Sequence, residues 1–348
     1  MSTLARIAAI ISLFPALIFA CLWDSDTIRD EIQARPSLFE LVTGHLPHHG
    51  TAYYEARVDR LEPKRDRSRE ETNDLAVALI RLGRFNEARA LLKAQLAKEP
   101  DRYITLSNLG VLHKKQGDYA RAADYIRQAL AIKPEGHMGL GDWYEQALTW
   151  SAQRETETSP PVENFLGDNY DKQKPSIGRS WPLTGEREEQ FDKLQNLLRN
   201  DQGFADGFLV MGDFLVTSGD LHLGMICYYR SLQLNHPNPA MVKRRIDNVR
   251  DHWREASLRF KQWTSQAKAG KMIDEAKSWL KMFQTTEAKL LGPGEEPDFK
   301  AVLAAMTNAE AAPSVSKSWA YFLAIAIVAC ALTALGFAVL KPRFTAKS

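Results

Sequence analysis

The sequence predicts an all-α protein, a solenoid of antiparallel helix pairs followed by one transmembrane helix near its C-terminal end. Three observations predict this fold. Apolar residues recur at helical spacing through most of the chain, glycines and prolines repeat at an interval of 34 residues, and residues 318–340 carry no charge. A repeat of that length is typical of stacked helical hairpins, each of which buries its apolar face against its neighbours.

Composition excludes several classes of protein. The chain has 348 residues, of which 25% are charged and 45% are hydrophobic, so it is not mainly disordered. Its formal net charge of +2 gives no chain-wide basic excess, and we expect no nucleic-acid partner. Cys21, Cys227 and Cys330 form no CxxC pair, which excludes a disulfide framework and the usual structural zinc modules.

The first 22 residues have the features of a secretory signal peptide. Arg6 precedes an apolar run from Ile7 to Trp23, which is shorter than the roughly 20 residues that a membrane helix needs. The residues just before Cys21 resemble a bacterial lipobox. Three outcomes stay open: cleavage near Ala20, lipidation of Cys21, or retention of residues 1–22 as an uncleaved anchor.

The uncharged segment at residues 318–340 predicts a membrane span. Its 23 residues would reach across a hydrocarbon core of about 30 Å as a helix, and Trp319 and Tyr321 stand at its upstream edge, where interfacial aromatics belong. Three basic residues follow it closely and one precedes it. The positive-inside rule therefore predicts a single-pass cell-membrane protein with a cytoplasmic C-terminal tail and the bulk of the chain outside the cytoplasm, in the periplasm.

Two copies of a repeat occupy the first part of the middle of the chain. Four pairs of residues are separated by 34 positions: Gly83 and Gly117, Phe85 and Tyr119, Ala88 and Ala122, and Pro100 and Pro134. Each copy shows two helical apolar patterns, a glycine-containing turn between them and a closing proline. The glycine permits a tight turn, the alanines let the two helices approach closely, and the aromatic residue fills the space between them.

This pattern resembles the tetratricopeptide repeat. The second copy carries eight residues at positions of the repeat consensus: Leu109, Gly110, Gly117, Tyr119, Ala122, Ala129, Leu130 and Pro134. The first copy is looser, with Ala76 and Gln95 in place of a glycine and an alanine, and a third, weaker copy follows at residues 208–237. Together with the Cys-Leu-Trp-Asp sequence at residues 21–24, the chain resembles bacterial exported, membrane-anchored repeat proteins that have no assigned activity.

The remaining segments predict how the repeats are framed. Residues 151–183 are rich in proline and poor in helical periodicity, which indicates an insertion between two repeat blocks, and an amphipathic helix follows at residues 187–200. Two long helices at residues 240–263 and 271–291, separated by Gly270, predict an antiparallel hairpin that caps the solenoid.

The predicted organisation comprises a signal peptide or uncleaved anchor (1–22), an N-terminal helical and loop segment (23–68), a first repeat block with two repeats and a following helix (69–150), an insertion (151–183), a second repeat block (184–237), a capping hairpin (238–291), a linker (292–317), a transmembrane helix (318–340) and a cytoplasmic tail (341–348).

The tetratricopeptide resemblance implies a concave groove that is lined by the first helix of each repeat and binds a protein or peptide. Carrying the groove positions onto this chain gives Asn73, Val77, Ile80, Arg81, Ile104, Ser107, Val111, Lys114, Lys115, Leu209, Asp213 and Val216. The basic members suit an extended peptide with an acidic feature or a C-terminal carboxylate. The family's Lys/Asn carboxylate clamp is not reproduced, because Val77 stands where an asparagine would be needed.

Other chemistry has little basis in the sequence. It contains no GxSxG, HExxH, GxxxxGK[ST] or GxGxxG motif, so we expect neither an enzyme nor a cofactor. Histidines and aspartates near the N-terminus could ligate a metal ion, but their spacing fits no standard site, and we assign no metal: Asp24, Asp26, His45, His48 and His49. An alternative hypothesis is an envelope enzyme or metal-dependent factor whose repeats only recruit a partner.

The predicted hairpin at residues 238–291 is basic. It holds twelve lysines and arginines against six acidic residues. A basic helical surface near a membrane is attracted to anionic lipid or to a charged cell-wall polymer, and we treat this contact as a further hypothesis.

Overall fold

A computed structural model describes residues 24, 29–30, 35–136, 139–177, 185–252, 265–292 and 294–311. Their secondary structure is helical apart from turns, loops and two isolated β-bridges. No helix in this part of the chain is long and apolar enough to cross a membrane. The predicted signal peptide, Cys21, Asp26 and the predicted membrane segment at residues 318–340 with its tail lie outside the described residues.

The chain divides into two units, residues 1–299 and 300–348. The second unit holds most of α14 (Phe299–Ala311). The contacts described below lie within the first unit.

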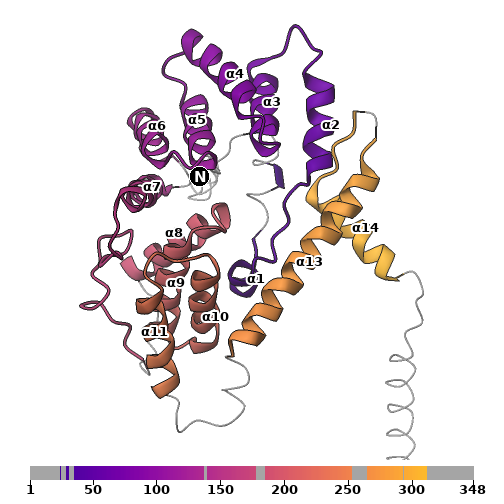
Figure 1. Ribbon diagram of the computed structural model, residues 1–348. Coiled ribbons are helices and arrows are strands. Elements are labelled where there is room, and N and C mark those ends of the chain that lie inside the picture. Colours follow the sequence, from indigo (N-terminus) through magenta and orange to yellow (C-terminus); the bar gives the residue numbers. More distant parts are fainter. Residues whose placement is uncertain are drawn as a thin grey trace, which may run out of the picture. The chain divides into compact units, whose positions relative to one another are not determined.

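Five consecutive helices form the first block (Figure 1): α3 (Arg69–Arg81), α4 (Phe85–Lys98), α5 (Tyr103–Lys115), α6 (Tyr119–Ile132) and α7 (Gly141–Thr156). Each packs against the next along the chain. The helices begin where the sequence supplies caps, because the Ser68 and Asp118 side chains accept main-chain N–H groups in the first turns of α3 and α6.

Glycines at the repeat positions perform the two tasks that the sequence predicts. Gly83 and Gly117, at the α3–α4 and α5–α6 turns, have φ angles of 75° and 81°, a conformation that strains a residue with a Cβ atom. Gly110 lets α5 and α6 approach closely, since a Cβ atom there would lie 2.7 Å from Cδ1 of Ile126 and 3.3 Å from the carbonyl oxygen of Ala122.

The second block contains α8 (Glu186–Asn200), α9 (Ala205–Ser218), α10 (Leu221–Gln233) and α11 (Pro239–His252). Two glycines bring α9 and α10 together. A Cβ atom on Gly212 would lie 2.5 Å from Cε1 of Tyr228, and one on Gly224 would lie 2.6 Å from Cγ2 of Val216. The aromatic ring and the branched side chain therefore fill space that only a glycine opposite leaves available.

The predicted capping hairpin is wrong in its second helix. Helix α13 (Gln266–Leu290) begins before Gly270, with Ser265 as its N-cap, and packs mainly against α10, α1 (Leu38–Thr43) and α2 (Thr51–Leu61) rather than against α11. Its buried face starts at Ala269 and continues at helical spacing. Burial of that apolar stripe offsets the roughly 1 kcal/mol that a glycine costs inside a helix.

The predicted insertion is shorter than its sequence suggests. Helix α7 continues to Thr156, so the irregular segment begins after it. Residues 157–177 contain an antiparallel β-bridge between Glu163 and Asn169, and Phe165 and Tyr170 of this segment are buried. Apolar anchors of this kind give a fixed position to a segment without helical periodicity.

Candidate functional site

A cavity of about 540 Å³ lies where the inner helices of the first block meet the turn between α8 and α9. Helices α3, α5 and α7 contribute to its wall, together with the start of α6 and the loop before α2. Its lining consists of His48, Arg81, Val111, Lys114, Lys115, Tyr119, Tyr144, Ser151, Arg199, Asn200, Asp201, Gln202, Gly203 and Phe204. Four of the predicted groove residues therefore meet in one place: Arg81, Val111, Lys114 and Lys115.

Positive charge dominates this basic cavity. Arg81, Lys114, Lys115 and Arg199 line it, and Asp201 is the single acidic residue among the lining residues that the structure describes. Nζ of Lys114 lies 2.6 Å from Oδ2 of Asp201. Partial burial, together with the charges of Arg81 and Lys114, lowers the pKa of Lys115, which Asp201 only partly counteracts. An anionic group in the cavity would relieve this repulsion.

Aromatic rings support two of the cations. The Arg81 guanidinium lies over the ring of Tyr54 at 5.8 Å from its centroid, and the Lys114 ammonium lies 5.5 Å from the ring centroid of Tyr144. Cation–π contacts of this kind favour the charged form and restrict the side chain's rotamers. The positive groups are therefore held in place before a ligand arrives.

The turn between α8 and α9 is fixed by a buried arginine. Arg230 of α10 donates a hydrogen bond to Oε1 of Gln202 at 2.6 Å and another to the main-chain oxygen of Val42 at 2.8 Å. Burial lowers the pKa of Arg230 to about 10. The Gln202 side chain also donates to the main-chain oxygen of Leu198 at 2.7 Å. These bonds attach the turn to α1 and α10.

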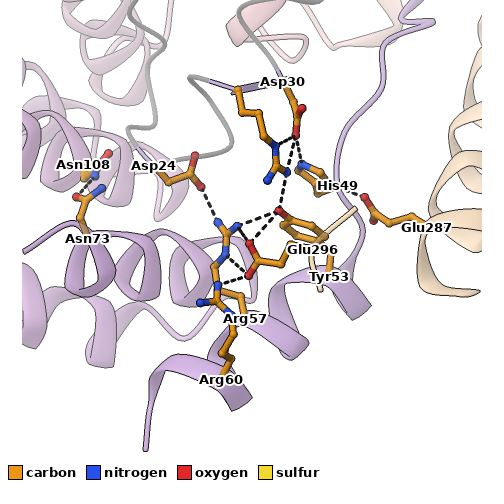
Figure 2. Close-up of polar contacts among 11 residues, drawn as sticks. Asp24, Asp30, His49, Tyr53, Arg57, Arg60, Asn73, Asn108, Glu287 and Glu296 are labelled. Atoms are coloured by element: carbon orange, nitrogen blue, oxygen red, sulfur yellow. Dashed lines mark hydrogen bonds and ion pairs between the residues drawn. The ribbon is translucent and has the colours of Figure 1, made fainter. Parts of the chain in front are cut away.

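Six of the predicted groove residues are buried and belong to the core: Asn73, Val77, Ile80, Ser107, Leu209 and Val216. In the first block, α3 packs against α2, α4 and α5, so the face that would line a groove is covered. Asn73 accepts a 2.7 Å hydrogen bond from Nδ2 of Asn108 (Figure 2), and the Ser107 hydroxyl donates to the main-chain oxygen of Tyr103. These polar groups satisfy one another or the backbone.

The two other predicted groove residues lie away from the basic cavity. Ile104 packs, half-buried, beside Tyr103 and Leu106. Asp213 lines a second cavity of about 740 Å³, which the insertion forms with α7, α8, α9 and α11. Its carboxylate accepts hydrogen bonds from the Tyr228 hydroxyl at 2.7 Å and Nε of Arg245 at 3.1 Å, and burial raises its pKa to about 6.

The N-terminal residues considered as metal ligands are divided among separate contacts (Figure 2). Nδ1 of His49 lies 2.5 Å from Oε1 of Glu287, and its ring stacks on Tyr53. His45 packs against Trp279, and His48 faces the basic cavity. Within the described residues, no group of three or more His, Cys, Asp or Glu side chains is arranged to hold a metal ion.

Basic residues of the predicted hairpin at residues 238–291 are largely engaged with the protein. Arg245 is buried and donates hydrogen bonds to Asp213 and to the main-chain oxygen of Tyr170. Arg244 pairs with Asp171 and Arg250 donates to the Tyr229 hydroxyl. These contacts hold the insertion and α11 in place.

Sequence reasoning missed the part of the basic cavity that the second block supplies. Arg199, Asp201 and Gln202 follow an ordinary amphipathic pattern at the end of α8, and no motif marks them. Tyr144 of α7 lies outside the two clear repeats. Only the packing of the second block against the first reveals these residues as part of a site.

The helix pairs and the preformed basic cavity define a helical repeat protein of the kind that binds other proteins. A family model described as tetratricopeptide repeat matches residues 73–137, which extend from within α3 to just beyond α6. The chain is thus a tetratricopeptide repeat protein, and such repeats are protein–protein interaction modules. No curated protein matches the sequence.

Proposed function

We propose that this chain is a non-enzymatic scaffold of the bacterial envelope that binds a protein or peptide partner outside the cytoplasm and is tethered to the membrane by residues 318–340. The basic cavity is the observation that carries the binding proposal. Four cations face one carboxylate there, which favours an acidic side chain or a C-terminal carboxylate as the group that enters.

Preorganisation supports binding at this cavity. Arg81 and Lys114 are held against tyrosine rings, and the α8–α9 turn is attached by Arg230, so little ordering is needed when a ligand binds. The volume of about 540 Å³ accommodates a few side chains of a peptide. A larger partner would insert an acidic segment and cover the rim.

Affinity capture with the full-length chain tests this function. A variant with Arg81, Lys114 and Lys115 changed to Glu is compared with the unchanged chain, using envelope extract from the source organism. The matched control reverses three exposed charges on the outer helices α4 and α6: Lys93, Lys98 and Arg121. We expect one partner that the unchanged chain and the control retain and the cavity variant loses. Equal capture by all three chains would contradict the proposal.

The membrane tether rests on the uncharged stretch, its upstream aromatic residues and the basic tail. Membrane fractions washed with alkaline carbonate should retain the unchanged chain. Changing both Ile327 and Leu332 to Arg should release it, because each arginine near the centre of a span costs about 2.5–3.5 kcal/mol on insertion scales. A chain that stays with the membrane after both changes would refute this tether.

A further inference from the structure

Asp201 is the feature of the basic cavity that a simple binding site would not need. Its carboxylate comes from the turn of the second block, whereas its partner Lys114 belongs to α5 of the first block. The pair is close and partly shielded, with 2.6 Å between Nζ and Oδ2 and side-chain exposures of 17% for Lys114 and 19% for Asp201.

The turn that carries Asp201 closes without help from its carboxylate. The Asp201 N–H donates to the main-chain oxygen of Leu197 at 2.9 Å, and the main-chain oxygen of Asp201 accepts from Phe204 at 3.2 Å. Gln202 and Arg230 attach the turn to its neighbours. Within the turn, the carboxylate accepts only a long bond of 3.3 Å from the N–H of Gly203. Its principal contact is therefore the Lys114 ammonium.

The position of this carboxylate matches what the cavity would offer a ligand. It is an acidic group on a connecting segment, inserted among cations, and it neutralises only part of their charge, since the pKa of Lys115 stays lowered beside Arg81 and Lys114. Those two remaining cations can attract a second carboxylate while Asp201 is still in place.

We propose that Asp201 is an intramolecular competitor of the basic cavity: its carboxylate occupies the place on Lys114 that a carboxylate of the partner takes, and partner binding displaces it. This inference rests on the proposed function. Displacement exchanges one ion pair for another at Lys114, so that residue contributes selectivity, while Arg81 and Lys115 contribute the net attraction. A neutral peptide gains no replacement contact for Lys114 and is rejected.

Fluorescence anisotropy with a labelled tetra-aspartate peptide tests the competition in the full-length chain. Asp201→Asn removes the competing charge and keeps the side-chain shape. We expect it to bind the peptide about fivefold more tightly, which corresponds to about 1 kcal/mol. The control Asp192→Asn makes the same change of net charge at an exposed position on α8, outside the cavity, and should leave the affinity unchanged.

A second background separates competition from a general charge effect. In Lys114→Gln chains, Asp201 has lost the cation for which it competes, so adding Asp201→Asn should change the affinity less than twofold. A full fivefold gain in that background would overturn the proposal. Two further probes distinguish the source of the carboxylate: a C-terminally amidated tetra-aspartate and a tetra-asparagine with a free carboxyl terminus.

The possible outcomes separate the inference from the proposed function. Binding of the tetra-aspartate peptide that Asp201→Asn does not strengthen overturns the competition and leaves the binding function standing. Failure of both the unchanged chain and Asp201→Asn to bind any of the probes overturns both. If thermal unfolding shows that Asp201→Asn is not folded, Asp201→Ser serves as the second variant, with the same fivefold gain expected.

Discussion

The buried Arg57 gives the sharpest test of what holds the N-terminal segment to the chain beyond α13. Its side chain is fully buried, and Glu296 accepts hydrogen bonds from both its Nε, at 3.0 Å, and its Nη2 (Figure 2). Arg60 pairs with the same carboxylate, and Asp24 lies 3.4 Å from Nη1 of Arg57. We predict that Glu296→Gln destabilises the protein substantially, because it removes the carboxylate that best compensates a buried charge.

The magnitude follows from the pKa of Glu296. Burial by itself would raise this pKa, but the hydrogen bonds and charges of Arg57 and Arg60 lower it from 4.5 to about 2. At about 1.36 kcal/mol per pKa unit, the shift corresponds to at most about 3 kcal/mol. Solvent screening of the partly accessible carboxylate reduces this figure, so we expect Glu296→Gln to lower the free energy of unfolding by about 2 kcal/mol at pH 7.

The pH dependence carries a definite sign. Because the pKa of Glu296 is lower in the folded state, its stabilisation is complete above about pH 4.5 and is lost as the pH falls toward 2. The difference in unfolding free energy between the unchanged chain and Glu296→Gln should therefore fall to less than half by pH 3.

Urea unfolding followed by circular dichroism at pH 7, 5 and 3 measures both effects. The control is Glu62→Gln, which removes an exposed ion pair with Arg84 and should cost less than about 0.5 kcal/mol. Equal stability of Glu296→Gln and the unchanged chain at pH 7 would refute the role of the carboxylate. A difference that is the same at pH 7 and pH 3 would refute the electrostatic origin.

Two further predictions concern the core and the turns. Asn108→Ala should lower the free energy of unfolding by about 1–3 kcal/mol, because it deletes a buried donor to Asn73, and calorimetry would show an unchanged melting temperature if the bond is immaterial. Gly83→Ala should cost about 1 kcal/mol, since φ is 75° and nothing lies near an added Cβ atom. Gly44→Ala should cost more in the same urea assay, because φ is 83° and the added atom would lie 2.8 Å from Nη1 of Arg230; a smaller loss than at Gly83 would contradict the packing.

Local rules accounted for much of the fold. The glycines at an interval of 34 residues predicted turns that require positive φ, and the alternation of apolar residues predicted the helices on either side. The same rules failed at Gly270, where a local preference against helix was outweighed by burial of the α13 face against α10 and α1. The insertion boundary was misplaced for a related reason, since α7 continues as far as Thr156.

The candidate site was predicted only in part. Arg81, Val111, Lys114 and Lys115 were assigned to a ligand-binding surface by their repeat positions, and they line one cavity. Asn73 was assigned by the same reasoning and is buried against Asn108. Repeat position describes which helix face a residue occupies but not what covers that face.

The sequence by itself determined the helical repeat, its turns and the concentration of positive charge on the inner helices, because each depends on spacing of a few residues along one chain segment. Only the tertiary structure decided that the α8–α9 turn places Asp201 against Lys114 and that Glu296 meets Arg57. Those pairs join residues far apart in the chain, and their formation depends on how whole helices pack, which no local pattern encodes.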